Sequence, residues 1–423
     1  MKCRYACGSP EHALHRRKFL GALAGVTGLG TVGFFTRPAV AKQLQKKQKH
    51  MLVIYLAGGV SQLETWDPKP GTDTGGPFRA IPTSVPGVHI CELLPHTAKQ
   101  MHRMALVRSL NTKNNDHGMG HYQMTHGRNR GGLNVPHVGA LVNRMLHPKE
   151  SPLPGFIHVG RGGDIKDAGY LGPQYGSLGL PSGGPPAGIA RPKGLSLEAD
   201  MRRHKFLRGV NNHFLAQRRS AETEAYTYSY EQALRLMEQR HVFEVDREPE
   251  KLREAYGSHP FGRHCLLARR LIEHGVTYVQ VNHTNYDTHH ENFNFHIEQL
   301  GEFDRTFATL LEDLASRGLL EHTLVVVMSE FGRTPRINER LGRDHWGRSW
   351  SIALAGCGIQ HGAVIGKTNK NGTAVAEREV DHGHLFHTYL QALGIDSTGN
   401  VDVNGRELPV ADPAREPIEE LLA

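Results

Sequence analysis

The chain has 423 residues, with 50 Lys and Arg, 42 Asp and Glu, 28 His and five Cys. Residues 1–41 hold six of the basic residues and one acidic residue, so 44 basic and 41 acidic residues remain, a net charge of only +3. This near balance argues against a nucleic-acid-binding protein. Cys91, Cys265 and Cys357 are the cysteines beyond residue 41, and without a CxxC pair they exclude a disulfide framework and a zinc–thiolate site.

The first residues have the features of an export signal. Arg16 and Arg17 stand in the run His-Arg-Arg-Lys-Phe-Leu, and a Gly/Ala-rich stretch and a small-x-small cleavage site at Ala39-Val40-Ala41 follow. We expect residues 1–41 to be a twin-arginine signal peptide and the mature protein to be periplasmic. A basic tail is the alternative. The apolar stretch is too short and too rich in glycine for a membrane span, so we expect no stable span after cleavage.

Residues 51–56 are continuously apolar and end in Gly58 and Gly59, which predicts a buried strand followed by a tight turn. Four elements are expected next: a helix over residues 96–104, a strand over 105–108, a helix over 135–146 and a strand over 156–159. Residues 160–194 are rich in Gly and Pro, and we expect either a loop over the site or a plain surface insertion. Residues 196–256 predict a helical insertion.

The second half alternates helices with apolar strands. Helices are expected to end at Gly275 and Gly318, where glycine can adopt the left-handed conformation of a helix C-terminus. The other expected elements are strands over 276–281, 323–328 and 351–355 and a helix over 385–393. This alternation indicates an α/β fold with a doubly wound, mostly parallel sheet sandwiched by helices, and residues 42–423 are expected to form one such domain.

The strongest candidate site follows strand 276–281. Asp287, His289 and His290 stand just beyond it, and the carboxyl end of a parallel strand is where active sites collect. Carboxylate and neutral imidazole are suitable ligands for Zn, Mn or Fe, so the run predicts a divalent metal site. The alternative is a capped loop in which Asp287 and Asn292 accept hydrogen bonds from the amides of a following helix.

Other polar residues also follow predicted strands or stand in Gly-rich loops. His117 and His121 are four residues apart, so on a helix they share one face, whereas in a polar loop they need no function. Glu330 ends strand 323–328, and Arg333 has a side chain suited to bidentate binding of an anionic ester. Further candidate metal ligands are Asp344, His345, His382 and His384. Glu64 and Asp67 are either ligands or part of an ordinary turn.

Several runs together resemble domain-of-unknown-function family 1501. They are Leu56-Ala57-Gly58-Gly59-Val60-Ser61, Trp66-Asp67-Pro68-Lys69-Pro70, Asp287-Thr288-His289, Glu330-Phe331-Gly332-Arg333-Thr334-Pro335 and Gly342-Arg343-Asp344-His345-Trp346. The resemblance covers nearly the whole mature chain. It implies an alkaline phosphatase-like fold of the sulfatase superfamily, whose better-known members hydrolyse phosphate or sulfate esters with one or two divalent metals.

The chain departs from that superfamily pattern in three places. Gly58 and Gly59 stand where aspartate ligands are expected, and Phe331 replaces a second ligand after Glu330. Counting back from Thr125 to the nucleophile position reaches Asp116 and His117, without a hydroxyl or thiol. The resemblance therefore implies one metal site, holding Zn, Mn, Fe or Ca and acting through an activated water.

Two functional hypotheses follow from the resemblance and the departures. The first is an exported hydrolase of a small-molecule or polysaccharide anionic ester. Its metal ligands would be Asp287, His289 or His290, and His382 or His384, its acid–base groups Glu330 and His117 or His121, and its anion-binding group Arg333. The second is an inactive descendant of the fold that serves as a binding or assembly protein in the cell envelope. A third possibility retains the metal for redox or metal handling.

Overall fold

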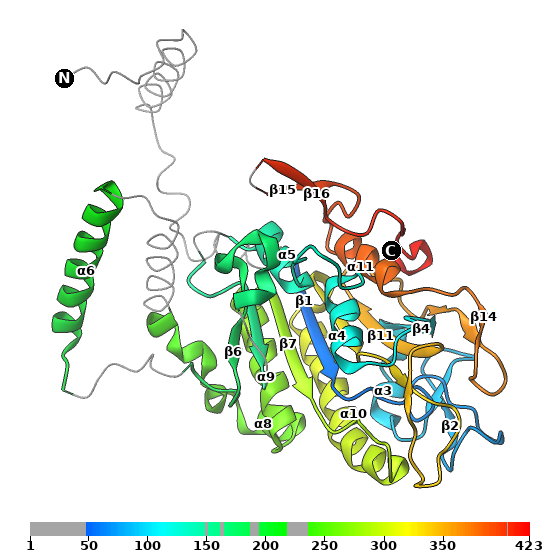
Figure 1. Ribbon diagram of the computed structural model, residues 1–423. Coiled ribbons are helices and arrows are strands. Elements are labelled where there is room, and N and C mark those ends of the chain that lie inside the picture. The colour runs from blue at the N-terminus through cyan, green and yellow to red at the C-terminus, as the bar shows by residue number, and fades with distance from the viewer. Residues whose placement is uncertain (1–47, 149–150, 161–164, 187–193, 218–235, 404) are drawn as a thin grey trace. The chain divides into compact units, whose positions relative to one another are not determined.

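The computed structural model describes residues 48–148, 151–160, 165–186, 194–217, 236–403 and 405–423 (Figure 1). The predicted signal peptide and residues 218–235 of the predicted helical insertion lie outside the described residues. Residues Gln48–Ala423 form one compact unit. None of the helices in the described ranges combines the length and the apolar character that a membrane crossing requires.

An eight-stranded sheet organises this unit, in the order β12-β4-β11-β8-β1-β7-β5-β6. Its strands are β1 (His50–Leu56), β4 (Met104–Leu110), β5 (Phe156–Val159), β6 (Leu178–Leu180), β7 (Tyr278–His283), β8 (Thr323–Met328), β11 (Trp350–Gly356) and β12 (Val364–Ile365). β11 is antiparallel to both of its neighbours, and the other pairs are parallel. The prediction of a mostly parallel α/β sheet is confirmed.

The central strand β1 is buried on both faces, as its continuous apolar sequence predicts. Met51, Val53 and Tyr55 belong to one apolar core, and Leu52, Ile54 and Leu56 to the other. Helices α4 (His117–His126), α5 (Val138–Leu146) and α11 (His382–Ala392) contribute to the first core. Helices α9 (Pro260–Glu273) and α10 (Asn292–Ser316) contribute to the second, so the sheet lies between two helical layers (Figure 1).

The remaining elements are short, apart from helix α6. The helices are α3 (Pro95–Ala98), α6 (Leu197–Gln217) and α8 (Glu250–Tyr256). The 3-10 turns are η1 (Met101–Arg103), η2 (Ile165–Leu171), η3 (Pro173–Tyr175), η4 (Arg240–Phe243), η5 (Val245–Arg247), η6 (Leu320–His322) and η7 (Glu419–Leu421). The small antiparallel pairs are β2 (Ala80–Pro82) with β3 (His89–Cys91), β9 (Gly332–Arg333) with β10 (His345–Trp346), β13 (Lys367–Thr368) with β14 (Val375–Glu377), and β15 (Asn400–Val403) with β16 (Arg406–Pro409).

Two predicted elements differ from the structure. The helix expected over residues 96–104 is the single turn α3 followed by η1, and strand β4 already begins at Met104. The stretch 160–194, expected to lack regular structure, contains β6, which pairs with β5 at the edge of the sheet. A three-residue strand is too short to produce a hydrophobic period, so the sequence alone did not indicate it.

The sheet brings three loops together at one edge. β1 pairs in parallel with β7 and with β8, so the segments that follow Leu56, His283 and Met328 begin side by side. The first of these segments needs Gly58 and Gly59, whose φ angles are +116° and +84°. A Cβ atom at Gly58 would lie 2.4 Å from the backbone nitrogen of Asp287, so no larger residue fits between these two loops.

We expect acid to destabilise the fold through His50, which begins β1 and is 1% exposed. Its Nδ1 lies 2.8 Å from the carbonyl oxygen of Val276. Burial lowers the pKa of His50 from 6.5 to about 4, because the interior disfavours the imidazolium form. Between these pH values the unfolded chain binds a proton that the folded chain does not, so stability falls as the pH falls, by about 3 kcal/mol at most.

The substitution His50→Gln tests this expectation. Urea denaturation between pH 7 and pH 4 should show a flatter pH dependence of the unfolding free energy for His50→Gln than for the wild type. His361→Gln, at an exposed position, is the matched control and should keep the wild-type slope. Equal slopes for wild type and His50→Gln would contradict the assignment.

Candidate metal centre

Three segments supply a cluster of histidines around Asp287. His117 is the first residue of α4, whose N-terminus is capped by Asp116 through a 2.8 Å hydrogen bond from the backbone nitrogen of Met119. Asp287 and His289 lie in the loop after β7, and His345 begins β10. β10 is held in place by its pairing with β9, which follows β8. Loops at the carboxyl edge of the sheet and the start of one helix therefore form the site.

The Nε2 atoms of the histidines converge on the Asp287 carboxylate. Asp287 Oδ1 lies 3.1 Å from His345 Nε2 and 3.2 Å from His289 Nε2, and Asp287 Oδ2 lies 3.4 Å from His117 Nε2. The Nε2 atoms of His289 and His345 are themselves 2.9 Å apart. The ligand atoms of His117, Asp287 and His345 all lie within 4.8 Å of one another. His289 adds a fourth potential ligand to this group.

The opposite nitrogen of each ring has a hydrogen-bond acceptor beside it. His117 Nδ1 is 2.7 Å from Glu330 Oε1, and His289 Nδ1 is 2.9 Å from Asp344 Oδ1. His345 Nδ1 is 2.8 Å from the carbonyl oxygen of Asn115. Carboxylates and carbonyls only accept, so each Nδ1 carries the proton and donates. In a neutral imidazole the Nε2 atom then carries a lone pair.

This hydrogen-bond pattern places only electron-rich atoms at the centre of the histidine cluster. Three Nε2 lone pairs and a carboxylate face one another at 2.9–3.4 Å, which is repulsive unless protons or a cation lie between them. Histidine whose second nitrogen is fixed by a carboxylate or carbonyl is the usual form of a metal ligand. The residues present therefore fit a divalent cation, and three nitrogens with one oxygen suit Zn, Mn or Fe better than Ca, which prefers oxygen.

The pKa values of the cluster agree with this account. The hydrogen bond to Glu330 raises the pKa of His117, so that without a cation this ring tends to take up a proton. Burial alone would raise the pKa of Asp287, but the hydrogen bond from Arg333, with the favourable charges around it, lowers the pKa to about 2. Asp287 is therefore ionised at neutral pH. The side chains of His117, His289 and Asp287 are 41%, 42% and 48% exposed, so the cluster opens to solvent.

Arg333 contacts Asp287 and backbone carbonyl oxygens in this structure. Its side chain is fully buried and donates hydrogen bonds to the carbonyl oxygens of Gly58, Gly59 and Arg343. Its Nη2 atom also lies 2.5 Å from Asp287 Oδ1. With these donors engaged and no surface exposed, the guanidinium orients Asp287 and the loop after β1. Binding of an ester anion by Arg333 stays a prediction.

Glu330 is likewise a supporting residue. Its side chain is 6% exposed, and Oε1 accepts hydrogen bonds from His117 and from the backbone nitrogen of Gly58. Oε2 accepts a hydrogen bond from Ser329. Burial alone would raise the pKa of Glu330, but the hydrogen bond from His117 and its other donors lower it, so it remains a carboxylate. Glu330 fixes the orientation of His117, and His117 moves from the predicted acid–base group to the group of potential ligands.

The other predicted site residues divide into two groups. Asp344 orients His289, as described above, and His121 lies one turn after His117 on α4, with its ring 5.1 Å from that of Tyr55. His290 instead packs against Phe295, and His382 and His384 lie in the first turn of α11. The His/Asp group found among the described residues contains none of these three histidines. The structure therefore does not bring His290, His382 and His384 into this group, and their role as metal ligands stays a prediction.

Sequence reasoning missed two features that shape the centre. Asn115 acts through its backbone carbonyl, which no side-chain motif can indicate. Arg343 appeared only as part of a family motif, yet it is fully buried and pairs with the equally buried Glu64 at 2.8 Å. The candidate ligands Glu64 and Asp67 are both structural, since Asp67 pairs with Lys69 at 2.9 Å. Arg343 stands directly before the candidate ligands Asp344 and His345, and this position was the only sign in the sequence that it helps to shape the centre.

We expect Glu330→Gln to weaken cation binding about 10- to 100-fold without unfolding the protein, because the amide is a poorer acceptor for His117 Nδ1–H. Competition with a metal-sensitive dye would measure this affinity. Glu379→Gln, at an exposed position, is the control and should bind the cation as the wild type does. Unchanged affinity in Glu330→Gln would exclude His117 from the ligand set.

Fold and site together define a doubly wound α/β protein with a partly exposed His/Asp cluster at the carboxyl edge of its sheet. Residues 48–422 match the family described as Protein of unknown function (DUF1501), and the chain belongs to that family. The sequence-based assignment to this family is confirmed. No curated protein matches the chain.

Solved structures of low similarity were also found. The PsFucS1 sulfatase from Pseudoalteromonas sp. is 14% identical, with 85% of this chain and 72% of that chain covered and a TM-score of 0.39. The lipoteichoic acid synthase LtaP from Listeria monocytogenes is 9% identical, with 89% and 81% covered and a TM-score of 0.38. Alkaline phosphatase from the Antarctic bacterium TAB5 is 12% identical, with 82% and 99% covered and a TM-score of 0.35. No residue role is transferred from these proteins.

Proposed function

We propose that the protein is an exported, divalent-metal-dependent hydrolase of anionic sulfate or phosphate esters. One observation carries the metal dependence: the Nδ1 atoms of His117, His289 and His345 are all fixed by acceptors, which directs their Nε2 lone pairs toward the carboxylate of Asp287. The ester class is what the expected place of the family in the sulfatase-like superfamily implies, and export is inferred from the N-terminal sequence.

The proposed ligands of the cation are His117, His289, His345 and Asp287. A bound divalent cation supplies a Lewis acid that polarises an ester oxygen and brings the pKa of water close to neutrality. The protein supplies the orientation: Glu330, Asp344 and the carbonyl of Asn115 hold the imidazole N–H groups, and Arg333 holds Asp287. The exposed side of the cluster leaves room for the substrate.

His121 is the proposed acid–base residue. It lies four residues after His117 on α4, so both rings are on one face of the helix, and its side chain is exposed. Although the residue reaches solvent, desolvation by the atoms packed around its ring lowers the pKa of His121, so the ring is neutral and able to accept a proton at pH 7. His117 and Glu330 are hydrogen-bonded to each other, which leaves His121 as the predicted catalytic residue best placed to exchange protons with a substrate.

A second candidate function is a binding or assembly protein without catalysis. Phe331 favours it, because its ring packs against His117 and His345, with centroid separations of 4.9 and 4.4 Å. This apolar side chain occupies the position where the superfamily pattern has a second ligand. Under this alternative the cation, if bound, would only stabilise the fold.

The experiment that separates the two functions uses residues 42–423 recovered after native export. Elemental analysis gives the metal content, and 4-nitrophenyl sulfate, 4-nitrophenyl phosphate and sulfated polysaccharides test hydrolysis. About one equivalent of Zn, Mn or Fe with ester hydrolysis that falls in His121→Gln supports the hydrolase. Stoichiometric metal without hydrolysis of any ester supports the binding protein, and the absence of metal overturns metal dependence. Export is tested by replacing Arg16 and Arg17 with Lys, which should retain the protein in the cytoplasm.

A further inference from the structure

A pocket of about 340 Å³ is lined in part by the segment that leads to Asn115, and it contains the histidine motif that the metal centre does not use. We call it the polar pocket. Its wall consists of residues 111–113 after β4, Gln123 of α4 and Asn129 after it, residues 379–382 and His384 at the start of α11, and Arg415. Its volume is within the usual range for small-molecule sites. The Asp381-His382-Gly383-His384 motif therefore belongs to a cavity of its own.

The wall of the polar pocket is almost entirely polar. Val380 is the one apolar side chain among the described residues that line the polar pocket, and the others offer amide, hydroxyl, imidazole or charged groups. The charges balance, since Lys113 and Arg415 are matched by Glu379 and Asp381. The wall thus combines many hydrogen-bonding groups with no net charge.

This combination restricts the class of ligand. An apolar ligand would remove the polar wall from water without replacing its hydrogen bonds, which costs free energy. A strongly charged ligand would gain little from a wall whose charges already cancel. A neutral molecule with many hydroxyl groups fits best, because each hydroxyl can both donate and accept. A saccharide unit is such a molecule.

Two polar groups in the polar pocket have no hydrogen-bond partner among the described residues. Within the described residues, the Lys113 ammonium makes no hydrogen bond or ion pair, and the buried Nδ1 atom of His382 has no hydrogen-bond partner. Lys113 also has a φ of +55°, a strained conformation for a residue with a side chain. By contrast, Asp381 is held by Arg415 and His384 and by two backbone amides, which keeps this side of the wall rigid.

One segment of the chain, residues 113–115, links the wall of the polar pocket to the residues that support the metal centre. Lys113 is followed by Asn114, whose amide donates to Gln123 at 3.3 Å, and by Asn115, whose carbonyl accepts from His345 at 2.8 Å. One short segment therefore forms part of the wall of the polar pocket and part of the support of the proposed ligands.

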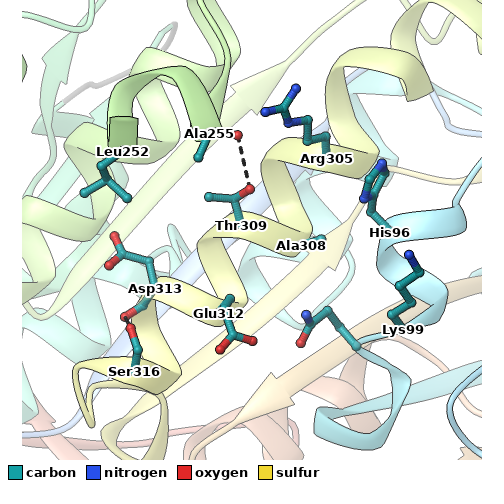
Figure 2. A pocket seen from close by; sticks show the side chains of 11 residues that line it. His96, Lys99, Leu252, Ala255, Arg305, Ala308, Thr309, Glu312, Asp313 and Ser316 are labelled. Carbon is teal, nitrogen blue, oxygen red and sulfur yellow. Dashed lines mark hydrogen bonds between the residues drawn. The ribbon is translucent and has the colours of Figure 1, made fainter. Parts of the chain in front are cut away.

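The larger groove between α3, α8 and α10 offers a different chemistry. It holds about 480 Å³, and Leu252, Ala255 and Ala308 give it an apolar floor beside the charged groups Lys99, Arg305, Glu312 and Asp313 (Figure 2). Its walls come from elements that supply none of the proposed ligands. The groove therefore differs from the polar pocket in its apolar floor and in sharing no segment with the support of the proposed ligands.

We propose that the polar pocket binds a neutral saccharide unit and that the substrate is a sulfate or phosphate ester of a saccharide. The substrate assignment rests on the proposed hydrolase function, whereas saccharide binding by the polar pocket does not. The polar pocket positions the sugar, and the metal centre acts on the ester group that the sugar carries.

The test measures binding of neutral hexasaccharides, namely maltohexaose, cellohexaose, agarohexaose and chitohexaose, by saturation-transfer NMR and calorimetry on metal-stripped protein. At least one is expected to bind, and Lys113→Met with Asn129→Leu should weaken it about tenfold or more, since two hydrogen bonds are lost. Lys370→Met, an exposed lysine elsewhere, is the matched control. If the double variant does not fold, the single variant Lys113→Met is measured instead, because Lys113 is exposed and its replacement should not disturb the fold.

Three outcomes overturn the proposal: none of the saccharides binds, binding is unchanged in the Lys113 variants, or only inorganic sulfate and phosphate bind. Saccharide binding that persists in Asp287→Ala while ester hydrolysis is absent in the wild type supports the polar pocket and overturns the proposed hydrolase. The two failures are therefore distinguishable.

Discussion

Asp287→Ala is expected to abolish stoichiometric binding of a divalent cation, and with it ester hydrolysis. Among the residues that the structure describes, Asp287 is the one within 3.4 Å of the Nε2 atoms of all three histidines, so its removal deletes the only anionic ligand that this part of the chain places at the centre of the cluster. Elemental analysis after dialysis measures the metal content, and calorimetry with Zn²⁺ or Mn²⁺ measures the affinity. We expect binding to fall below the detection limit of both methods.

Asp287 also pairs with the buried Arg333, so alanine at this position has a second effect on stability. Asp287→Asn controls for it, because the amide oxygen still accepts from Arg333 while the negative charge is lost. Asp73→Ala, an exposed aspartate, should retain the wild-type metal content. A full equivalent of metal in both Asp287 variants would show that the cation, if present, is held elsewhere.

Arg343→Met is expected to destabilise the fold by about 3–5 kcal/mol, because it leaves the carboxylate of Glu64 buried without a partner. Both side chains are fully buried, and Arg343 Nη2 lies 2.8 Å from Glu64 Oε1. The guanidinium also donates to the carbonyl oxygens of Thr74, Thr334 and Pro335. It therefore links the loop after β1 to the loop that precedes His345. Guanidinium chloride unfolding at pH 7 measures the loss.

The double variant Glu64→Leu with Arg343→Met should recover much of this loss, because it removes both charges together. Arg378→Met is the control for an exposed pair. Arg378 and Glu420 are 39% and 50% exposed, and pairs of this kind contribute less than about 1 kcal/mol. A loss in Arg343→Met no larger than that in Arg378→Met would contradict the structural role of the buried pair.

The strands of the sheet were the most predictable part of the fold. β8 begins and ends where its apolar run begins and ends, at Thr323 and Met328, because a central strand is buried on both faces. The antiparallel direction of β11 was not predictable, because parallel and antiparallel central strands have the same apolar composition. The sequence predicted one helix over residues 96–104, where the structure has α3 and η1. Over nine residues, the spacing of apolar residues does not distinguish one continuous helix from two short turns.

The site was partly predictable for a related reason. Asp287, His289 and His345 follow elements that end at one edge of the sheet, so strand order brings them together. The direction of a side chain depends on tertiary contacts, and Arg333 therefore turned inward to the carbonyls of Gly58 and Gly59. The run Asp381 to His384 looked like a ligand motif, but Asp381 and His384 form the capping box of α11.

The contact between Arg333 and Asp287 has a consequence for the protein when its cation is removed. In many metal sites the carboxylate ligand of the apo protein is left as an uncompensated charge. Here the guanidinium acts as a permanent internal counter-ion, 2.5 Å from Asp287 Oδ1. Chelation should therefore empty the centre while the loops at the sheet edge keep their conformation. The metal-free protein would then stay folded and bind its cation reversibly, without a new folding step.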